Sequence, residues 1–350
     1  MMMTDKVLSK EKIGEFVDGL SGRYTVVAPV RRDGSPAEFR DVTAQDSIVI
    51  DGSAALMPPK DYFLPRYEKL MRVDTRDGQV QIEAPVPEAV PRVMLGAWLP
   101  DVKALDVLDK VFLGEKFKDP YYAARRENTV TVAVVPLEPR WSWFCTSVDD
   151  VTEWKSKADV LSYDLGDAIY FEPITERGAA ILDGAALADP TDGQVAAKEG
   201  VWKAFAEVPH CAFAGKDLYE NLCWDSPIWD DIAQRCVSCG VCTYVCPSCS
   251  CFDVQDEVCG SNCIERYRCR DTCQFEDFTL MGAGHNPREQ KVPRARQRLM
   301  HKFKYQREQF GITACTGCGR CVEMCPVNID IRDALCTVCS SEIETTAGTT

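Results

Sequence analysis

The amino-acid sequence predicts an α+β protein in which an N-terminal mixed α/β domain is followed by an α-helical, ferredoxin-like domain. Cysteine usage separates the two parts, because residues 1–210 contain Cys145 alone and residues 211–339 contain the other eighteen. Strand-like and helix-like segments alternate in the first part, which favours a sheet covered by helices. Two cysteine motifs of the same spacing lie in the second part, on either side of a long, helix-prone insertion at 247–314. We therefore expect three regions: an α/β docking domain at 1–225, a dicluster domain at 226–335 and a C-terminal tail at 336–350.

The composition is that of a globular protein without a nucleic-acid-binding surface. Of the 350 residues, 45% are hydrophobic and 27% are charged, and the net charge is -14. Phosphate contacts need a basic face, so the acidic surplus argues against nucleic-acid binding. No secretory leader and no apolar stretch of about 18 residues is present, so no membrane span is expected. The nineteen cysteines cluster in metal-ligand spacings, which favours metal ligation over a disulfide framework and predicts a reducing, cytoplasmic location.

The first domain shows an order of elements but no catalytic motif. It contains no glycine-rich dinucleotide loop, no phosphate loop and no nucleophile elbow. We assign no catalytic residue to it. Strands are expected at 24–30, 47–50, 80–82, 92–95, 130–135, 160–163 and 168–171. Helices are expected at 9–20, 101–113, 119–127, 177–188 and 193–207.

The two motifs each read C-x2-C-x2-C-x3-C-P, the spacing that presents three thiolates to one iron-sulfur cube and a fourth to a second cube. Zinc is the alternative, but zinc sites use separated cysteine pairs and do not need the third cysteine or the Cys-Pro ending. Gly240 and Gly319 allow the backbone to approach the cluster closely. By the cross-over rule, two [4Fe-4S] clusters are predicted: a first ligand set of Cys236, Cys239, Cys242 and Cys325, and a second ligand set of Cys315, Cys318, Cys321 and Cys246.

The remaining cysteines leave two interpretations open. Six lie in the insertion, where the x3 spacings would face the same way on a helix: Cys249, Cys251, Cys259, Cys263, Cys269 and Cys273. They could form an additional iron-sulfur site, to which Cys211, Cys223, Cys336 and Cys339 could also contribute. The alternative is that they are buried, inert thiols around an apolar cluster environment.

A helix is predicted at 294–309, within a basic segment at 288–307 that contrasts with the acidic chain. Three interpretations fit the basic residues. They can form a solvated helix face, a docking surface for an acidic partner, or a positive charge that offsets anionic, thiolate-ligated clusters.

The chain resembles a known family, the iron-sulfur β subunits of sulfhydrogenases together with the corresponding iron-sulfur subunits of anaerobic sulfite reductases. In the second part, the resemblance is carried by the stretches at 239–254, 278–288, 296–303 and 315–332. In the first part, it is carried by 61–65, 102–105, 119–129 and 144–147. The family usually has further cysteines before 102–105 and just before 144–147, which this chain lacks. In the other direction, Cys259, Cys263, Cys269, Cys336 and Cys339 are additional to the family pattern.

The resemblance implies a dicluster electron-transfer subunit of an anaerobic oxidoreductase complex. Its partners would be a subunit that binds flavin and pyridine nucleotide and one of the hydrogenase, sulfite reductase or heterodisulfide-reductase-like type. Such a chain relays single electrons and catalyses no bond formation itself. Two alternatives are a catalytic subunit, with an additional cluster at 247–314 acting on a small sulfur or disulfide substrate, and a metal-stabilised assembly scaffold.

Overall fold

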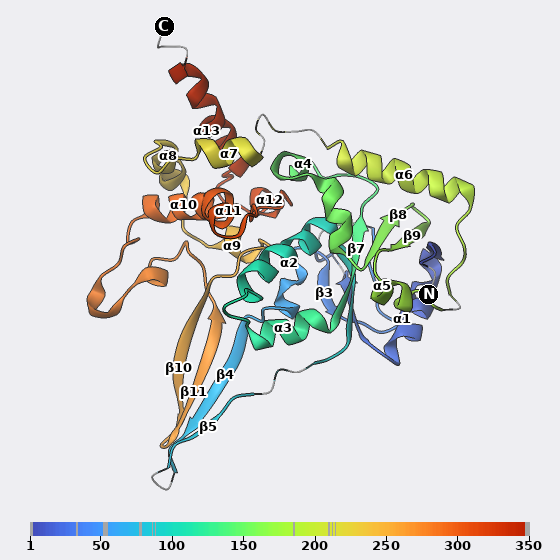
Figure 1. Cartoon of the computed structure of the whole chain (residues 1–350), viewed down its shortest axis with the longest axis horizontal. Coiled ribbons are helices and arrows are strands. Elements are labelled where there is room, and N and C mark those ends of the chain that lie inside the picture. Colours follow the sequence, from blue (N-terminus) through green and yellow to red (C-terminus); the bar gives the residue numbers. More distant parts are fainter. Residues whose placement is uncertain are drawn as a thin grey trace.

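A seven-stranded mixed sheet forms the centre of the N-terminal part (Figure 1). Its strand order is β1-β9-β8-β7-β6-β2-β3; β2, β6, β7 and β8 are parallel neighbours, and the outer strands pair antiparallel. The parallel strands are rich in buried β-branched residues, as strands covered on both faces must be. The bounds are β1 (Lys6–Ser9), β2 (Thr25–Val30), β3 (Glu38–Asp41), β6 (Arg92–Trp98), β7 (Thr129–Val135), β8 (Val160–Asp164) and β9 (Ala168–Pro173).

Helices cover this sheet, as the alternating order predicts. Helix α1 packs on β2, α2 on β6 and β7, α5 on β7 and β9, and α6 on β7 and β8. The computed structural model describes residues 3–346 except 33, 52–54, 77–78, 86, 88, 185, 209–210, 212 and 214. Within them the helix bounds are α1 (Ile13–Ser21), α2 (Leu99–Phe112), α3 (Pro120–Glu127), α4 (Cys145–Val148), α5 (Glu176–Ile181) and α6 (Asp192–Ala206).

Two predicted elements of this part are wrong. Residues 47–50 form no named strand; Ile48 makes one isolated bridge with Val30. The helix expected at 177–188 ends at Ile181, because a turn at Gly184 follows it. Strands β1 and β3, which have four residues each, are too short to show a clear period in the sequence.

A second, four-stranded antiparallel sheet joins the two halves of the chain, with the order β10-β11-β4-β5. Strands β4 (Tyr67–Asp74) and β5 (Gln81–Glu83) come from the first part, whereas β10 (Phe252–Gly260) and β11 (Cys263–Arg270) come from the insertion. The sheet projects from the body of the molecule (Figure 1).

The insertion is therefore not wholly helical, and the prediction is wrong over 252–270. Apolar and polar residues alternate along β10 and β11, a period of two that belongs to strands. The partner strand β4 lies nearly 200 positions earlier in the chain, so local sequence carries no sign of the ladder; Ile264 pairs with Val73, for example. The ladder crosses the expected domain boundary near 225, which stays a prediction.

The remaining helices gather beside the larger sheet around a second apolar core (Figure 1). The predicted helix at 294–309 is present but is interrupted by a π-helical turn at His301–Tyr305. One helix runs from Ile331 to Thr346 and crosses position 336, where the tail was expected to begin; this boundary stays a prediction. No helix in the described part of the chain is long and apolar enough to cross a membrane. The bounds are α7 (Gly215–Asn221), α8 (Ile228–Arg235), α9 (Val241–Tyr244), α10 (Lys291–Met300), α11 (Gln306–Phe310), α12 (Arg320–Glu323) and α13 (Ile331–Thr346).

Candidate metal centre

The two cysteine motifs adopt the same local structure. In each, a glycine with positive φ, 73° at Gly240 and 76° at Gly319, precedes a one-turn helix, α9 or α12. Residues with a Cβ seldom adopt this backbone conformation, and the surrounding atoms leave no room for a Cβ at either position. A Cβ on Gly240 would lie 2.9 Å from the Thr272 side chain, and a Cβ on Gly319 would collide with Ser142. Glycine at this point of the motif is therefore required by conformation and by space.

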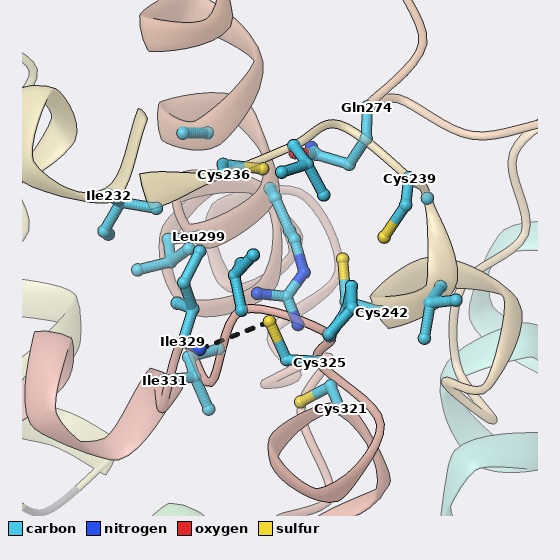
Figure 2. Close-up of a pocket in the computed structure, with 17 residues that line it drawn as sticks. Ile232, Cys236, Cys239, Cys242, Gln274, Leu299, Cys321, Cys325, Ile329 and Ile331 are labelled. Carbon is cyan, nitrogen blue, oxygen red and sulfur yellow. Dashed lines mark hydrogen bonds between the residues drawn. The ribbon is translucent and has the colours of Figure 1, made fainter. Parts of the chain in front are cut away.

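The structure brings the first ligand set together. Cys236, Cys239 and Cys242 line one pocket with Cys325 from the other motif (Figure 2). The pocket also contains Cys321, which belongs to the second ligand set, so the two sets are adjacent. The remaining wall is largely apolar and includes Ile232, Leu299, Ile329 and Ile331. Backbone N–H groups point at the sulfurs: Ile329 donates to Cys325 Sγ at 3.2 Å, and Ser238 to Cys236 Sγ at 3.3 Å.

The second ligand set contains a buried cysteine, Cys318, whereas Cys239 of the first ligand set is exposed. Burial raises the pKa of the Cys315 and Cys318 thiols to about 12, and the charge of Cys246 adds to both shifts. Cys246 therefore lies beside cysteines of the opposite motif; that it shares a cluster with them stays a prediction. Gly317 N–H donates to Cys315 Sγ at 3.5 Å. Thiols that hold their protons this firmly must release them when metal binds, so binding has to overcome this cost.

Two buried cations stand among the thiols. Lys302 Nζ donates to Cys246 Sγ at 3.1 Å and to Ser248 Oγ at 3.2 Å. Arg298, one turn earlier, lines the pocket of the first ligand set. A hydrogen bond from Cys249 and the charges of Lys302 and Lys60 hold the pKa of Cys246 well below its usual value.

The basic segment at 288–307 thus points largely inward. Arg294, Arg298 and Lys302 are buried, and Arg294 donates to the Arg288 carbonyl at 3.0 Å. Of the three interpretations, the placement favours positive charge that offsets the thiolates over a solvated face or a docking surface.

The N-terminal part contributes to the site, which the sequence did not indicate. Lys60 Nζ is buried and donates to the carbonyls of Thr243 at 3.2 Å, Cys246 at 2.6 Å and Cys249 at 3.0 Å. Burial lowers the pKa of Lys60 to about 8. Lys60 therefore fixes the end of the first motif loop from a distance of more than 180 positions in the chain.

The second motif loop is held from the same side. Arg320 in α12 forms a buried ion pair with Asp101 in α2 and donates to the Ala55 carbonyl at 3.2 Å. Ser142 Oγ donates to Glu323 at 2.6 Å, and Phe144 N–H donates to the Gly317 carbonyl at 2.9 Å. Asp101 adjoins a stretch that carries the family resemblance, but nothing in its spacing indicates a partner in the second motif.

The six insertion cysteines do not form one site, which corrects the prediction. Cys259 and Cys263 are joined by a disulfide across the turn between β10 and β11, and Cys269 lies on β11. They lie on strands, so the helical spacing argument fails. Among described residues, Cys259, Cys263 and Glu265 are the one group of three ligand atoms within 4.8 Å, but two of its sulfurs are already bonded. Cys249, Cys251 and Cys273 line a different cavity.

The other single cysteines are spread around the second core. Cys145 is buried; its Sγ donates to the Gly317 carbonyl at 3.4 Å, and burial raises its pKa. Burial and then the charge of Cys336 raise the pKa of Cys211, so these two thiols are neighbours. Cys223 is exposed, and Cys339 packs against the second core.

Comparison with known proteins agrees with this geometry. Residues 235–329 match a family described as a 4Fe-4S dicluster domain. The chain is 28% identical to sulfhydrogenase 2 subunit beta of Pyrococcus furiosus over 338 residues. This alignment covers 92% of this chain and 95% of that protein. The resemblance to sulfhydrogenase β subunits is confirmed. No solved structure matches the chain. The matched domain spans both motifs, so the chain is an iron-sulfur protein with a role in electron transfer.

Proposed function

We propose that this chain relays single electrons through two [4Fe-4S] clusters inside a multi-subunit, cytoplasmic oxidoreductase of anaerobic metabolism. Its partners would be a flavin and pyridine-nucleotide-binding subunit and a second redox subunit of the hydrogenase, sulfite reductase or heterodisulfide-reductase type. Two observations support the proposal: Cys325 lines the pocket of Cys236, Cys239 and Cys242, and Cys246 lies close enough to Cys315 for its charge to act on that thiol. The name of the Pyrococcus relative, a sulfhydrogenase subunit, supports the assembly with partners.

The residues fit two adjacent clusters. Each ligand set offers four thiolates, and an iron-sulfur cube supplies reversible one-electron chemistry when bound. Cys321 of the second ligand set lines the pocket of the first ligand set, so the two sets lie next to each other. Apolar walls limit water, and buried Arg298 and Lys302 offset the negative charge of eight thiolates.

The two sets differ in exposure, which suggests a direction for partner access. Cys239 of the first ligand set is exposed, and the neighbouring Val237 is 54% exposed. Cys318 of the second ligand set is buried beneath residues 142–145 and Arg320. A partner that exchanges electrons with this chain would therefore reach the first cluster most directly.

The relay is tested with the anaerobically purified, iron-loaded chain. We expect about eight iron atoms per chain in the two motif clusters and a reducible spectrum that dithionite bleaches. Hydrogen, sulfite or disulfide turnover should be absent until partner subunits are added. Two zinc ions and no iron in the motifs would contradict the proposal, as would sustained turnover by the chain alone.

The Lys302 side chain is expected to raise the reduction potential of the second cluster. Replacing Lys302 with methionine removes a positive charge beside Cys246 Sγ, so an added electron becomes less favourable. Unit charges about 5 Å apart interact by about 3 kcal/mol at an effective dielectric constant of about 20. For one electron, this predicts a potential lower by on the order of 100 mV.

An EPR-monitored redox titration measures this shift. The matched control is Lys304→Met in the same helical segment, because Lys304 Nζ donates to the Leu222 carbonyl at 2.8 Å. Equal potentials in the Lys302→Met variant and the control would contradict the role given to Lys302.

A further inference from the structure

Three cysteines that neither ligand set uses converge on one cavity. Cys249, Cys251 and Cys273 line it together with Arg298, His301 and Lys302. Val107 and Val111 of α2 and Ala314 close other sides, so the cavity lies between the N-terminal part and the helical part.

The backbone that carries these cysteines is tied in place from several sides. Asp271 N–H donates to the Cys251 carbonyl at 3.0 Å, which joins the segment after the first motif to the segment after β11. The hydroxyl of Thr243 donates to Thr272 Oγ1 at 2.6 Å, directly before Cys273. Gln274 donates to the Arg294 carbonyl at 3.0 Å, directly after it. Four separate segments thus hold the cysteines at a common site.

The lining is too polar for an empty apolar void. Lys302 and Arg298 are buried cations that line the cavity beside the three cysteines. Arg298 Nε is buried and has no hydrogen-bond partner among the described residues. Buried polar atoms are normally paired, so an unpaired donor at the cavity indicates an occupant that accepts hydrogen bonds, as the sulfurs of a cluster do.

The chemistry of the lining defines the occupant. Thiolates are soft ligands that select zinc or iron-sulfur clusters, and His301 adds an imidazole. The three sulfurs are not all within 4.8 Å of one another, which is wider than the spread of ligands around a single zinc ion. We propose that Cys249, Cys251 and Cys273 hold a third iron-sulfur cluster, next to the second ligand set.

Metal analysis of anaerobically purified variants tests the third cluster. We expect about twelve iron atoms and a matching amount of acid-labile sulfide in the full chain, and about four fewer of each in Cys273→Ser and in Cys251→Ser. The EPR signals of the two motif clusters should remain in both variants. The matched control, Cys269→Ser, changes a cysteine on the neighbouring strand that does not line the cavity, and it should retain all the iron.

The outcomes separate this inference from the relay. Iron that stays at about eight atoms per chain in the full chain and in both variants would overturn the third cluster and leave the two-cluster relay intact. One zinc ion per chain that is lost on substitution would also overturn it, because the cavity would then hold a single ion. If Cys273→Ser loses all of its clusters, the Cys251→Ser variant, which changes the other segment, decides the question. Retention of the motif signals in Cys251→Ser together with about four fewer iron atoms would support the third cluster.

Discussion

Replacing Cys246 with serine is expected to remove the cluster of the second motif and to leave the cluster of the first. Cys246 is the last cysteine of the first motif, yet its charge acts on Cys315 and Cys318 of the second, and Lys302 donates a hydrogen bond to its sulfur. A serine oxygen is a poor substitute for a thiolate on iron, so the second ligand set would keep three good ligands. We expect a loss of up to about four iron atoms per chain, measured by metal analysis and EPR.

The reciprocal variant makes the expectation specific. Cys325→Ser should damage the first cluster, because Cys325 lines the pocket of Cys236, Cys239 and Cys242. The control is Cys223→Ser, which changes an exposed cysteine outside both sets. If Cys246→Ser instead removed the signal of the first motif, each motif would bind its own cluster and the cross-over would be wrong.

Removing the carboxylate of Asp101 is expected to destabilise the protein by about 3–5 kcal/mol. Asp101 and Arg320 form an ion pair in which both side chains are almost fully buried. Without Asp101 the guanidinium stays in a low-dielectric site with no counter-charge, which is far more costly than losing an exposed pair. The Asp101→Ala variant should therefore unfold at a lower urea concentration, followed by circular dichroism under anaerobic conditions.

Two further variants test the physical reason. Asp106 lies on the same helix as Asp101, but its carboxylate is partly exposed. The Asp106→Ala variant should therefore lower the free energy of unfolding by no more than about 1 kcal/mol. A double variant, Asp101→Leu with Arg320→Met, replaces the pair by apolar side chains and should recover most of the loss. If Asp101→Ala lowers the free energy of unfolding by less than about 1 kcal/mol, the Asp101–Arg320 ion pair does not join the two parts of the protein.

Local sequence was sufficient wherever structure depends on near neighbours. The parallel strands at Arg92–Trp98 and Thr129–Val135 were predicted because buried strands read as continuous apolar runs. The motif loops were predicted because their spacing and glycines set the backbone directly. The hairpin at 252–270 was missed because regular cysteine spacing was interpreted as a helical period, while its partner strand is remote in sequence.

The sequence by itself determined the chemistry that we expect of the candidate site: eight cysteines in two motifs of iron-sulfur spacing, which a short spacing rule is enough to recognise. Only the tertiary structure decided what surrounds those thiolates. Lys60 and Asp101 reach the motif loops from the N-terminal part, and Cys249, Cys251 and Cys273 share a cavity that Cys259 and Cys263 do not. These contacts join residues far apart in the chain, and their pairing follows from how helices and sheets pack, which no local pattern records.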